Sequence, residues 1–327
     1  MDNRKLQQRP DRELLGRLLR CVDCHSKLPA PNANGSVVCT TCSSAYPGFR
    51  NRPVLMRQDN SLFPRSDYQV KPNGSSEKAV RHGIGARIKS LAPGRSVNLA
   101  RDRMFARIVH DHGKMARTIL VLGCGDQANS VLDFFRELPA IFVFCDVDKG
   151  ADVDLFCDSH ALPFSDISFD GVITTAVFEH VASPDQVAGE IHRVLAPDGF
   201  VYSELPFLQA VHEGAYDFTR FTLSGHRMLF RHFQEIEAGL VAGPGTALVW
   251  AITEFAKALS GNKRISSILG LIARFAFFWF KYFDLWMARN AQSADAASCT
   301  FFYGTNCRVP QDDATIVAKY RSTGSAG

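Results

Sequence analysis

The sequence of residues 118–148 is TILVLGCGDQANSVLDFFRELPAIFVFCDVD, and this stretch decides the fold. An apolar run is followed by a glycine-containing turn, a helical segment, a second apolar run and an acidic residue. Such a unit brings its second strand parallel to its first, so the turn at Gly123 and Gly125 lies at the same sheet edge as Asp146. Ligands bind at that edge of a parallel sheet.

Gly123, Gly125 and Asp146 are residue types that can bind a nucleoside at this edge. Gly123 and Gly125 let the backbone approach a ligand closely, and the amides that open the next helix present partial positive charge to an anionic group. The Asp146 carboxylate, about twenty residues further on, can accept hydrogen bonds from both ribose hydroxyls. These residues predict a nucleoside-cofactor site. Gly123, Gly125 and Ala128 also fit the dinucleotide fingerprint G-x-G-x-x-G/A, so NAD-dependent oxidoreduction is one alternative.

The segment after Asp148 favours a different cofactor. It contains four motifs in order: D-x-x-x-L-P-F at 158–164, S-F-D at 168–170, E-H at 179–180 and E-I-x-R-V-L-x-P-x-G at 190–199. With these motifs, residues 118–233 resemble class I S-adenosylmethionine-dependent methyltransferases of the methyltransferase type 11 kind. NAD-dependent chemistry would leave everything after Asp148 unexplained.

The resemblance implies an α/β fold with a Rossmann-like, seven-stranded sheet, its last strand antiparallel and helices on both faces. It also implies cofactor contacts. Gly123 and Gly125 would flank the methionine part of S-adenosylmethionine, Asp146 would hold the ribose, and Asp158 would accept a hydrogen bond from the adenine amino group.

Two positions depart from the family pattern. Val121 stands where the family usually has an acid, and Gln127 stands where a third glycine is often found. Both lie at the expected aminopropyl end of the cofactor site. They motivate one alternative function, a non-catalytic methyltransferase-like binding or scaffold protein.

Four N-terminal cysteines form two C-x2-C pairs separated by fourteen residues: Cys21, Cys24, Cys39 and Cys42. Two such pairs place four thiolates at the corners of a tetrahedron, the geometry of a structural zinc ion with no open position for water. The region through YPGFRNRPVLM, residues 46–56, resembles the small Trm112-like zinc-ribbon domain. A ribbon can also dock a protein partner.

Composition sets the remaining limits. The 327 residues are 46% hydrophobic, as in an ordinary globular protein, and the net charge of +4 gives no support for nucleic-acid binding. We expect an N-terminal helix and zinc ribbon (1–56), a linker (57–96), a methyltransferase domain (97–310) with a helical insertion (246–290), and a polar tail (311–327). The polar, basic start lacks a signal-peptide pattern, which predicts a cytoplasmic location.

The helical insertion is apolar nearly all round, yet no uncharged run in it reaches the eighteen residues that a bilayer crossing needs. Three interpretations stay open. The block is a helical layer packed on the sheet, a lid over an apolar substrate, or a surface helix that contacts a membrane or a partner. Peripheral membrane contact would involve residues 265–290.

Catalytic groups are expected in the loops that follow the fourth and fifth strands. His180 and His212 are the available bases for removing a proton from a methyl acceptor. The loop at 206–222 gathers Tyr216, Asp217 and Arg220 as candidate substrate-binding residues, and Asp217 and Arg220 could equally brace the loop as a salt bridge.

The favoured function is methyl transfer from S-adenosylmethionine to an oxygen or nitrogen of a small or lipid-like acceptor. RNA-base methylation is the second hypothesis, because a zinc ribbon ahead of a methyltransferase domain also resembles some ribosomal RNA modifying enzymes. The chain lacks an N-P-P-Y motif and a strong basic stripe, so RNA is not the favoured acceptor.

Overall fold

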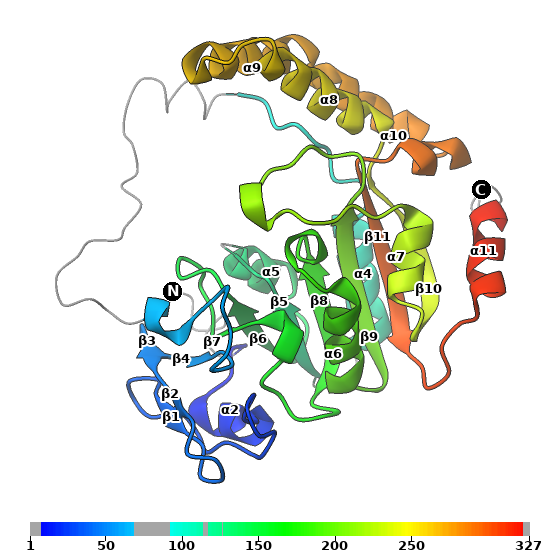
Figure 1. The fold of residues 1–327 in the computed structure, drawn as a ribbon. Helices are drawn as coiled ribbons and strands as arrows, with labels where there is room; N and C mark the ends of the chain where they lie inside the picture. The colour runs from blue at the N-terminus through cyan, green and yellow to red at the C-terminus, as the bar shows by residue number, and fades with distance from the viewer. Residues whose placement is uncertain (1–7, 69–91, 114–116, 126, 323–327) are drawn as a thin grey trace.

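The computed structural model describes residues 8–68, 92–113, 117–125 and 127–322. At its centre is a nine-stranded sheet of order β10-β11-β9-β8-β5-β6-β7-β4-β3 (Figure 1). The strands are β3 (Gly48–Phe49), β4 (Arg52–Leu55), β5 (Arg117–Leu122), β6 (Ala140–Asp146), β7 (Leu155–Cys157), β8 (Phe169–Thr175), β9 (Leu195–Pro206), β10 (Phe233–Ala242) and β11 (Cys299–Asn306).

Strands β4 to β9 pair in parallel, whereas β11 lies antiparallel between β9 and β10. The seven strands β5 to β11 therefore give the predicted fold class, which is confirmed. Strand order reverses at β5, since β6 and β8 lie on its two sides. In parallel α/β sheets this reversal opens a crevice at the carboxyl ends of the strands, where ligands bind.

Helices cover both faces of the sheet (Figure 1). Alternate residues of β5 point to opposite faces, so Leu120 packs in one core with α6 (Pro184–Val194) and α7 (Leu223–Leu229). Ile119 packs in the other core with α4 (Arg101–His112) and α5 (Ala128–Phe134). Helix α4 begins at Arg101, where the Asn98 side chain accepts the amide protons of Ala100 and Arg101.

The N-terminal region is joined to this sheet. It contains α2 (Arg12–Leu18) and a small antiparallel pair, β1 (Val37–Val38) with β2 (Ala45–Tyr46). Its strand β4 pairs in parallel with β7 through Val54 and Leu55, and both side chains are fully buried. The ribbon-like region thus extends the sheet rather than lying apart from it, which the sequence did not predict.

Part of the predicted linker is also ordered against the fold. Residues 57–68 end in the 3-10 helix η1 (Arg65–Tyr68), whose Tyr68 ring is buried against Phe156. Residues 69–91 of that predicted linker lie outside the described residues. The predicted polar tail contains α11 (Asp313–Ser322), which buries Ile316.

The insertion at 246–290 projects beyond the carboxyl edge of the sheet (Figure 1). It contains α8 (Pro244–Ala258), α9 (Lys263–Phe277), the 3-10 helix η5 (Phe278–Phe283) and α10 (Asp284–Met287). We name these elements, residues 244–287, the apolar hairpin. Among the described residues, no helix has both the length and the hydropathy that a bilayer span requires.

Candidate functional site

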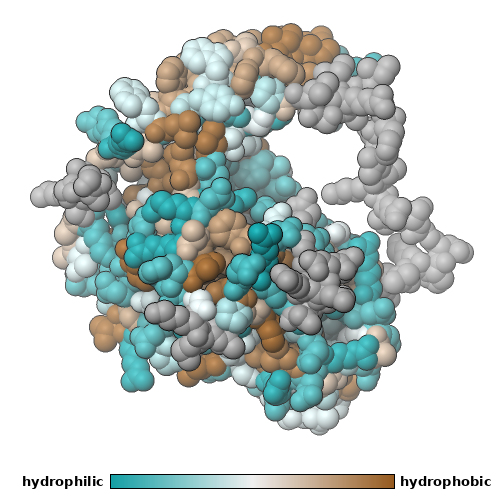
Figure 2. Space-filling view, turned by 180° about the vertical axis from the view of Figure 1, so that it is seen from behind, coloured by the Kyte–Doolittle hydropathy of each residue, from teal (hydrophilic) through white to brown (hydrophobic). Residues whose placement is uncertain are grey.

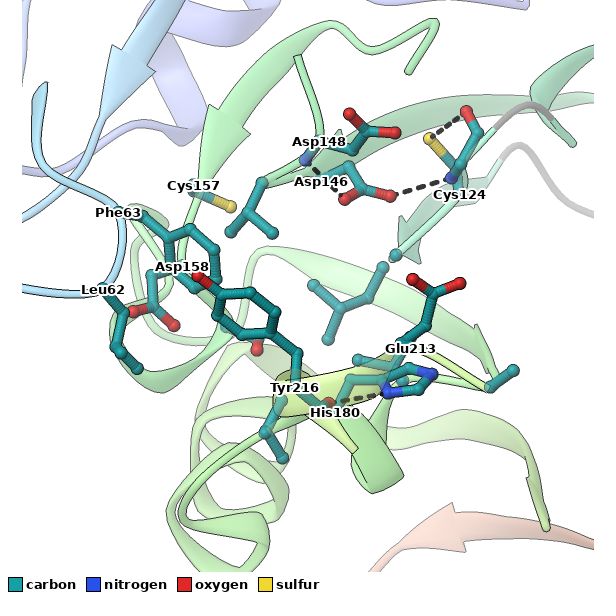
Figure 3. Close-up of a pocket in the computed structure, with 18 of the residues that line it drawn as sticks. Leu62, Phe63, Cys124, Asp146, Asp148, Cys157, Asp158, His180, Glu213 and Tyr216 are labelled. Carbon is teal, nitrogen blue, oxygen red and sulfur yellow. Dashed lines mark hydrogen bonds between the residues drawn. The ribbon is translucent and has the colours of Figure 1, made fainter. Parts of the chain in front are cut away.

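A cleft of about 650 Å³ opens at the carboxyl ends of β5, β6, β7 and β8 (Figure 3). Its remaining walls come from residues 62–68 and from the loop after β9. The cleft therefore lies where the strand order reverses, at the edge that the Gly turn and Asp146 predicted. Gln127, one of the two departures from the family pattern, also lines it.

Backbone geometry at the turn requires glycine. Gly123 and Gly125 have φ angles of +68° and +50°, a left-handed conformation that costs an L-residue about 1–2 kcal/mol. A Cβ atom on Gly123 would also lie 2.2 Å from Cγ2 of Val177, whereas one on Gly125 would meet nothing within 4 Å. Close packing explains the first glycine, and the open cleft beside the second leaves room for a ligand.

Asp146 ties the turn to the end of β6. Its Oδ2 accepts the Gly125 amide proton at 2.8 Å, and its Oδ1 accepts the Asp148 amide proton at 2.9 Å (Figure 3). Burial raises the pKa of this carboxyl, although the two backbone donors act in the opposite direction. The side chain lines the cleft and still has acceptor capacity for ribose hydroxyls.

Asp158 is held by two neighbours at the adjacent wall. His160 donates to its Oδ1 through the backbone amide, and the imidazole Nδ1 lies 2.6 Å from the same atom. Asn60 donates to Oδ2 at 2.7 Å. Burial alone would raise the pKa of Asp158, but the contacts with His160 outweigh it and lower the pKa. The ionised carboxylate therefore faces the cleft as an acceptor.

Two aromatic rings close over this part of the cleft. Phe63, from the predicted linker, stacks on Tyr216, from the loop after β9, with ring centroids 5.9 Å apart (Figure 3). Below them the Tyr68 hydroxyl donates to the Val147 carbonyl. The N-terminal region thus contributes directly to the cleft.

Three side chains meet at the other end of the cleft. Nε2 of His180 lies 3.7 Å from Oε1 of Glu179, and Nε2 of His212 lies 3.9 Å from the same oxygen. The Nδ1 of His180 donates to the Tyr216 carbonyl at 2.8 Å (Figure 3). The residue Glu179 is 1% exposed, and neither carboxylate oxygen has a hydrogen-bond partner among the residues that the structure describes. The structure therefore brings both predicted bases to one buried carboxylate.

Burial favours the uncharged forms of Glu179 and His180. It raises the pKa of Glu179 to about 7 and lowers the pKa of His180, since in both cases the charged form is disfavoured. The backbone carbonyl of Glu179 also accepts the amide protons of Phe218 and Thr219. These bonds fix the loop after β9 against the end of β8.

Asp217 and Arg220 form a two-pronged salt bridge. The Arg220 contact holds the pKa of Asp217 at about 2, and Asp217 Oδ2 also accepts the His212 amide proton at 2.9 Å. Of the three predicted substrate-binding residues, Tyr216 lines the cleft, whereas the other two brace the loop. Substrate contact by these residues stays a prediction.

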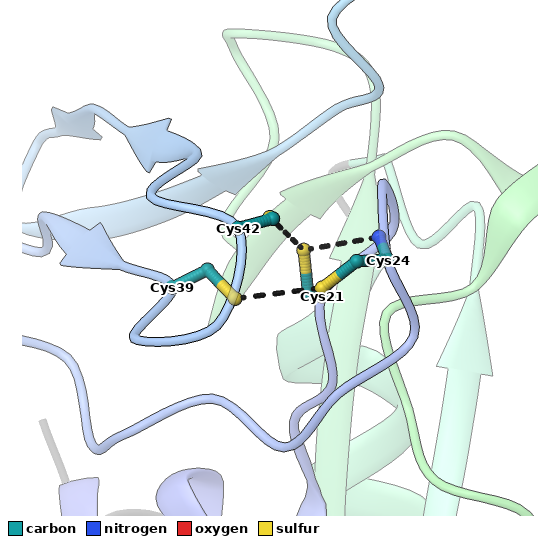
Figure 4. A group of neighbouring side chains, drawn as sticks. All are labelled: Cys21, Cys24, Cys39 and Cys42. Carbon is teal, nitrogen blue, oxygen red and sulfur yellow. Dashed lines mark hydrogen bonds between the residues drawn. The ribbon is translucent and has the colours of Figure 1, made fainter.

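The four predicted metal ligands also meet. The Sγ atoms of Cys21 and Cys42 are 3.6 Å apart, as are those of Cys24 and Cys39, and all four lie within 4.8 Å of one another (Figure 4). Zinc–sulfur bonds of about 2.3 Å at tetrahedral angles place the sulfurs roughly 3.8 Å apart. The cluster therefore fits a zinc ion.

Sequence reasoning missed three residues of this region: Phe63, which lines the cleft, and Asn60 and Glu179, which contact side chains that line it. Asn60 and Phe63 lie in a polar stretch without periodicity, so no local pattern indicated that they turn back onto the sheet. Glu179 was noted as half of the E-H pair, but only the fold shows that its carboxylate is buried between two imidazoles. The pair itself was the signal that could have found it.

Comparison with known proteins agrees with this geometry. Residues 120–203 match the family model described as a methyltransferase domain. The match spans the Gly turn, Asp146, Asp158 and the E-H pair, so the predicted methyltransferase resemblance is confirmed for this part of the chain. A search of curated proteins finds no match to the sequence.

Solved structures give a broad likeness. A proposed sarcosine dimethylglycine methyltransferase from Galdieria sulphuraria is 13% identical, with a TM-score of 0.41 over 64% of this chain and 86% of that one. Phosphoethanolamine N-methyltransferase 2 of Haemonchus contortus, solved with S-adenosyl-L-methionine, is 15% identical, with a TM-score of 0.40 over 63% and 53%.

The complex of the Haloferax volcanii methyltransferase activator Trm112 with a proposed methyltransferase is also similar. It is 20% identical, with a TM-score of 0.38 over 65% of this chain and 96% of that one. TM-scores below 0.5 assign neither activity nor substrate to this chain.

Proposed function

We propose that this protein transfers the methyl group of S-adenosylmethionine to an oxygen or nitrogen of a small or lipid-like acceptor. The observation that carries the proposal is the cleft itself. A glycine turn, the acid of β6 and an ionised acid after β7 surround it, and the segment that builds it matches a methyltransferase domain. In this proposal Gly123 and Gly125 flank the methionine part, Asp146 holds the ribose, and Asp158 accepts from the adenine.

Methyl transfer depends on alignment of the acceptor atom, the methyl carbon and the sulfur, and it needs no covalent intermediate with the protein. A lone pair on the acceptor forms the new bond to the methyl carbon, and the carbon–sulfur bond breaks with its electron pair remaining on sulfur. An O–H or N–H acceptor also gives up its proton. His180 and His212 line the cleft and are proposed to assist that loss, while Tyr216 contacts the acceptor and Asp217 with Arg220 positions the loop.

The apolar hairpin supports a lipid-like acceptor, because it exposes many apolar side chains and turns two basic ones, Arg274 and Lys281, inward. Trp286 is 76% exposed, whereas Lys281 is 6% exposed and donates to the Gly94 carbonyl. Arg274 likewise turns inward to the carbonyls of Ala92 and Pro93. The exposed apolar side chains are Leu248, Phe255, Leu259, Ile265, Ile268, Ile272, Phe275, Phe277, Trp279, Tyr282, Phe283, Leu285 and Trp286.

Figure 2 shows brown, apolar side chains gathered over this projecting layer. Charge complements that surface: Lys263 and Arg264, at the start of α9, are exposed, whereas the two acids of the hairpin are paired or buried, Glu254 with Lys257 and Asp284 in the interior. Asp284 accepts the amide protons of Gly243, Gly245 and Thr246 at the start of α8. Apolar and aromatic side chains with basic neighbours suit the surface of an anionic bilayer. We propose that the hairpin rests on such a surface.

The hairpin also reaches the cleft. Trp250 of α8 lies beside His212, with ring centroids 6.3 Å apart, and Arg95 stacks on the same indole. An acceptor held in a bilayer would therefore approach the cleft at its histidine end. This placement supports a lipid-like acceptor over a freely soluble one.

The cysteine cluster is proposed to hold a structural zinc ion. Its four sulfurs fit tetrahedral coordination, and the ion would stabilise the loops that precede β3 and β4. A protein partner that docks on this ribbon stays a prediction.

Cofactor binding tests the proposal. Isothermal titration of the full chain with S-adenosylhomocysteine should give a one-to-one complex, and Asp146→Asn should weaken it about tenfold or more, because a charged acceptor for the ribose is lost. Glu137→Gln removes an equally negative carboxylate that is 77% exposed and remote from the cleft, and it should bind as the parent does. No binding by the parent, or equal binding by both variants, would refute the cofactor assignment.

Vesicle sedimentation tests the membrane surface. The full chain should pellet with phosphatidylcholine vesicles that contain phosphatidylglycerol and less with phosphatidylcholine alone. Ile268→Ser combined with Trp286→Ser should abolish pelleting without changing affinity for S-adenosylhomocysteine. If both proteins stay in the supernatant and light scattering gives a dimer only for the parent, the hairpin is a contact between copies and the bilayer proposal fails.

A further inference from the structure

Glu179, His180 and His212 form a second group of side chains that could hold a metal ion, apart from the four cysteines. Two imidazoles and one carboxylate are a common ligand set for divalent transition metals, and they leave coordination positions open. The three ligand atoms lie within 4.8 Å of one another. A cation with bonds of about 2.0–2.2 Å needs ligands roughly 3–3.5 Å apart, which a small movement of the exposed His212 side chain provides.

The orientation of each imidazole is fixed by its other nitrogen. Nδ1 of His180 lies 2.8 Å from the Tyr216 carbonyl, which can only accept, so this nitrogen carries the proton. Nδ1 of His212 lies 3.3 Å from the Ala210 carbonyl and 3.4 Å from Asp217 Oδ2. In both rings the lone pair is therefore left on Nε2, the atom that faces Glu179. Carbonyl and carboxylate partners of this kind orient metal-binding histidines.

The carboxylate provides an independent observation. Glu179 is almost completely buried, yet neither of its oxygens has a hydrogen-bond partner within the described part of the chain. An unsatisfied buried carboxylate costs several kcal/mol unless a cation compensates it. The Arg220 guanidinium, whose charge acts on Glu179, is already engaged by Asp217. Both histidines line the cleft, so a cation bound here would face it.

We propose that Glu179, His180 and His212 bind a divalent transition-metal ion whose open positions face the methyl acceptor. This inference rests on the proposed methyl transfer and narrows it to an acceptor with an oxygen nucleophile. A bound cation lowers the pKa of a coordinated hydroxyl, so the proton leaves to water before the oxygen attacks the methyl carbon. His180 and His212 then assist proton loss as ligands rather than as free bases.

Cobalt titration of the zinc-loaded full chain tests the site directly. The cysteine cluster retains its zinc, so the parent should bind one equivalent of Co²⁺ and develop visible d–d bands without the near-ultraviolet absorption of cobalt–thiolate bonds. Glu179→Gln and His212→Ala should each lose this equivalent while keeping one zinc by elemental analysis. His110→Ala changes a histidine on α4 whose side chain is 88% exposed, and it should bind cobalt as the parent does.

S-adenosylhomocysteine titration of the same four proteins separates the two proposals. Cofactor binding by all four with no cobalt bound by the parent overturns the metal site and leaves methyl transfer standing. Cobalt bound by the parent and lost in both variants, without any cofactor binding, supports the metal site and refutes methyl transfer. Cobalt retained by Glu179→Gln and His212→Ala overturns the assigned ligands.

Discussion

The close approach of Gly123 to Val177 predicts a measurable coupling between the Gly turn and the segment after β8. Gly123→Ala places a Cβ 2.2 Å from Cγ2 of Val177 and holds an alanine at φ +68°. The left-handed backbone costs about 1–2 kcal/mol, and the overlap costs about 1–3 kcal/mol more. We therefore expect Gly123→Ala to lower the free energy of unfolding by about 2–5 kcal/mol.

A double-mutant cycle isolates the overlap. In Gly123→Ala with Val177→Ala the Cγ2 atom is gone, and the next contact, to Cβ of residue 177, is an ordinary 3.4 Å. The double variant should therefore be more stable than the two single effects predict, by about 1–3 kcal/mol. Urea unfolding followed by circular dichroism, with equal zinc in every sample, gives the four free energies.

Gly125→Ala provides the matched comparison, since it has a positive φ of +50° but no atom within 4 Å of the added Cβ. Gly125→Ala should lower the free energy of unfolding by about 1–2 kcal/mol, and its effect should be additive with that of Val177→Ala. A coupling below about 0.5 kcal/mol between Gly123→Ala and Val177→Ala would refute the packing argument.

Three further predictions concern other parts of the fold. Burial lowers the pKa of His226 to about 3. Below pH 6.5 the unfolded chain therefore takes up a proton at this imidazole that the folded chain does not, and the folded state loses stability as pH falls. Between pH 7.5 and 5.5 the parent should lose about 1.4 kcal/mol more unfolding free energy than His226→Gln; equal losses would contradict a neutral buried imidazole. Phe63→Ala and Tyr216→Ala should each speed cofactor release about three- to tenfold in stopped-flow measurements, and the double variant should add little, because the two rings form one cover. Cys39→Ser should bind one zinc fewer and show faster hydrogen exchange in β4 but not in β11; unchanged exchange in β4 would mean that the cluster does not support that strand.

Much of the sheet could be predicted from the sequence, because its strands are apolar runs at familiar spacing. The predicted seven strands are present as β5 to β11, and the last of them, β11, is antiparallel to its neighbours. The turn and Asp146 could be placed at one edge because two parallel strands have their carboxyl ends at the same edge of the sheet. The place of Asp158 at the cleft could be predicted from the D-x-x-x-L-P-F motif at 158–164.

Other features depend on contacts between distant segments. The four residues of β4 could equally have closed a separate ribbon, and nothing local indicates their pairing with β7. In the helical insertion, Arg274 and Lys281 turn inward because they donate to backbone carbonyls at 92–94, and the apolar side chains are left exposed; nothing local to 246–290 indicates these partners. Within residues 8–68, 92–113, 117–125 and 127–322 the Glu179 carboxylate lacks a hydrogen-bond partner, which depends on its surroundings in the fold and has no sequence signature.

The parallel pairing of β4 with β7 also fixes the stoichiometry of the molecule. A ribbon that docks as a separate subunit can dissociate and can be shared among several catalytic partners. Here the N-terminal region is part of the same chain and supplies an edge of the same hydrogen-bonded sheet, so each cleft has one such region, independent of protein concentration. Both parts should therefore melt in a single calorimetric transition, and a chain shortened to begin at β5 would leave the β7 edge bare and prone to self-association.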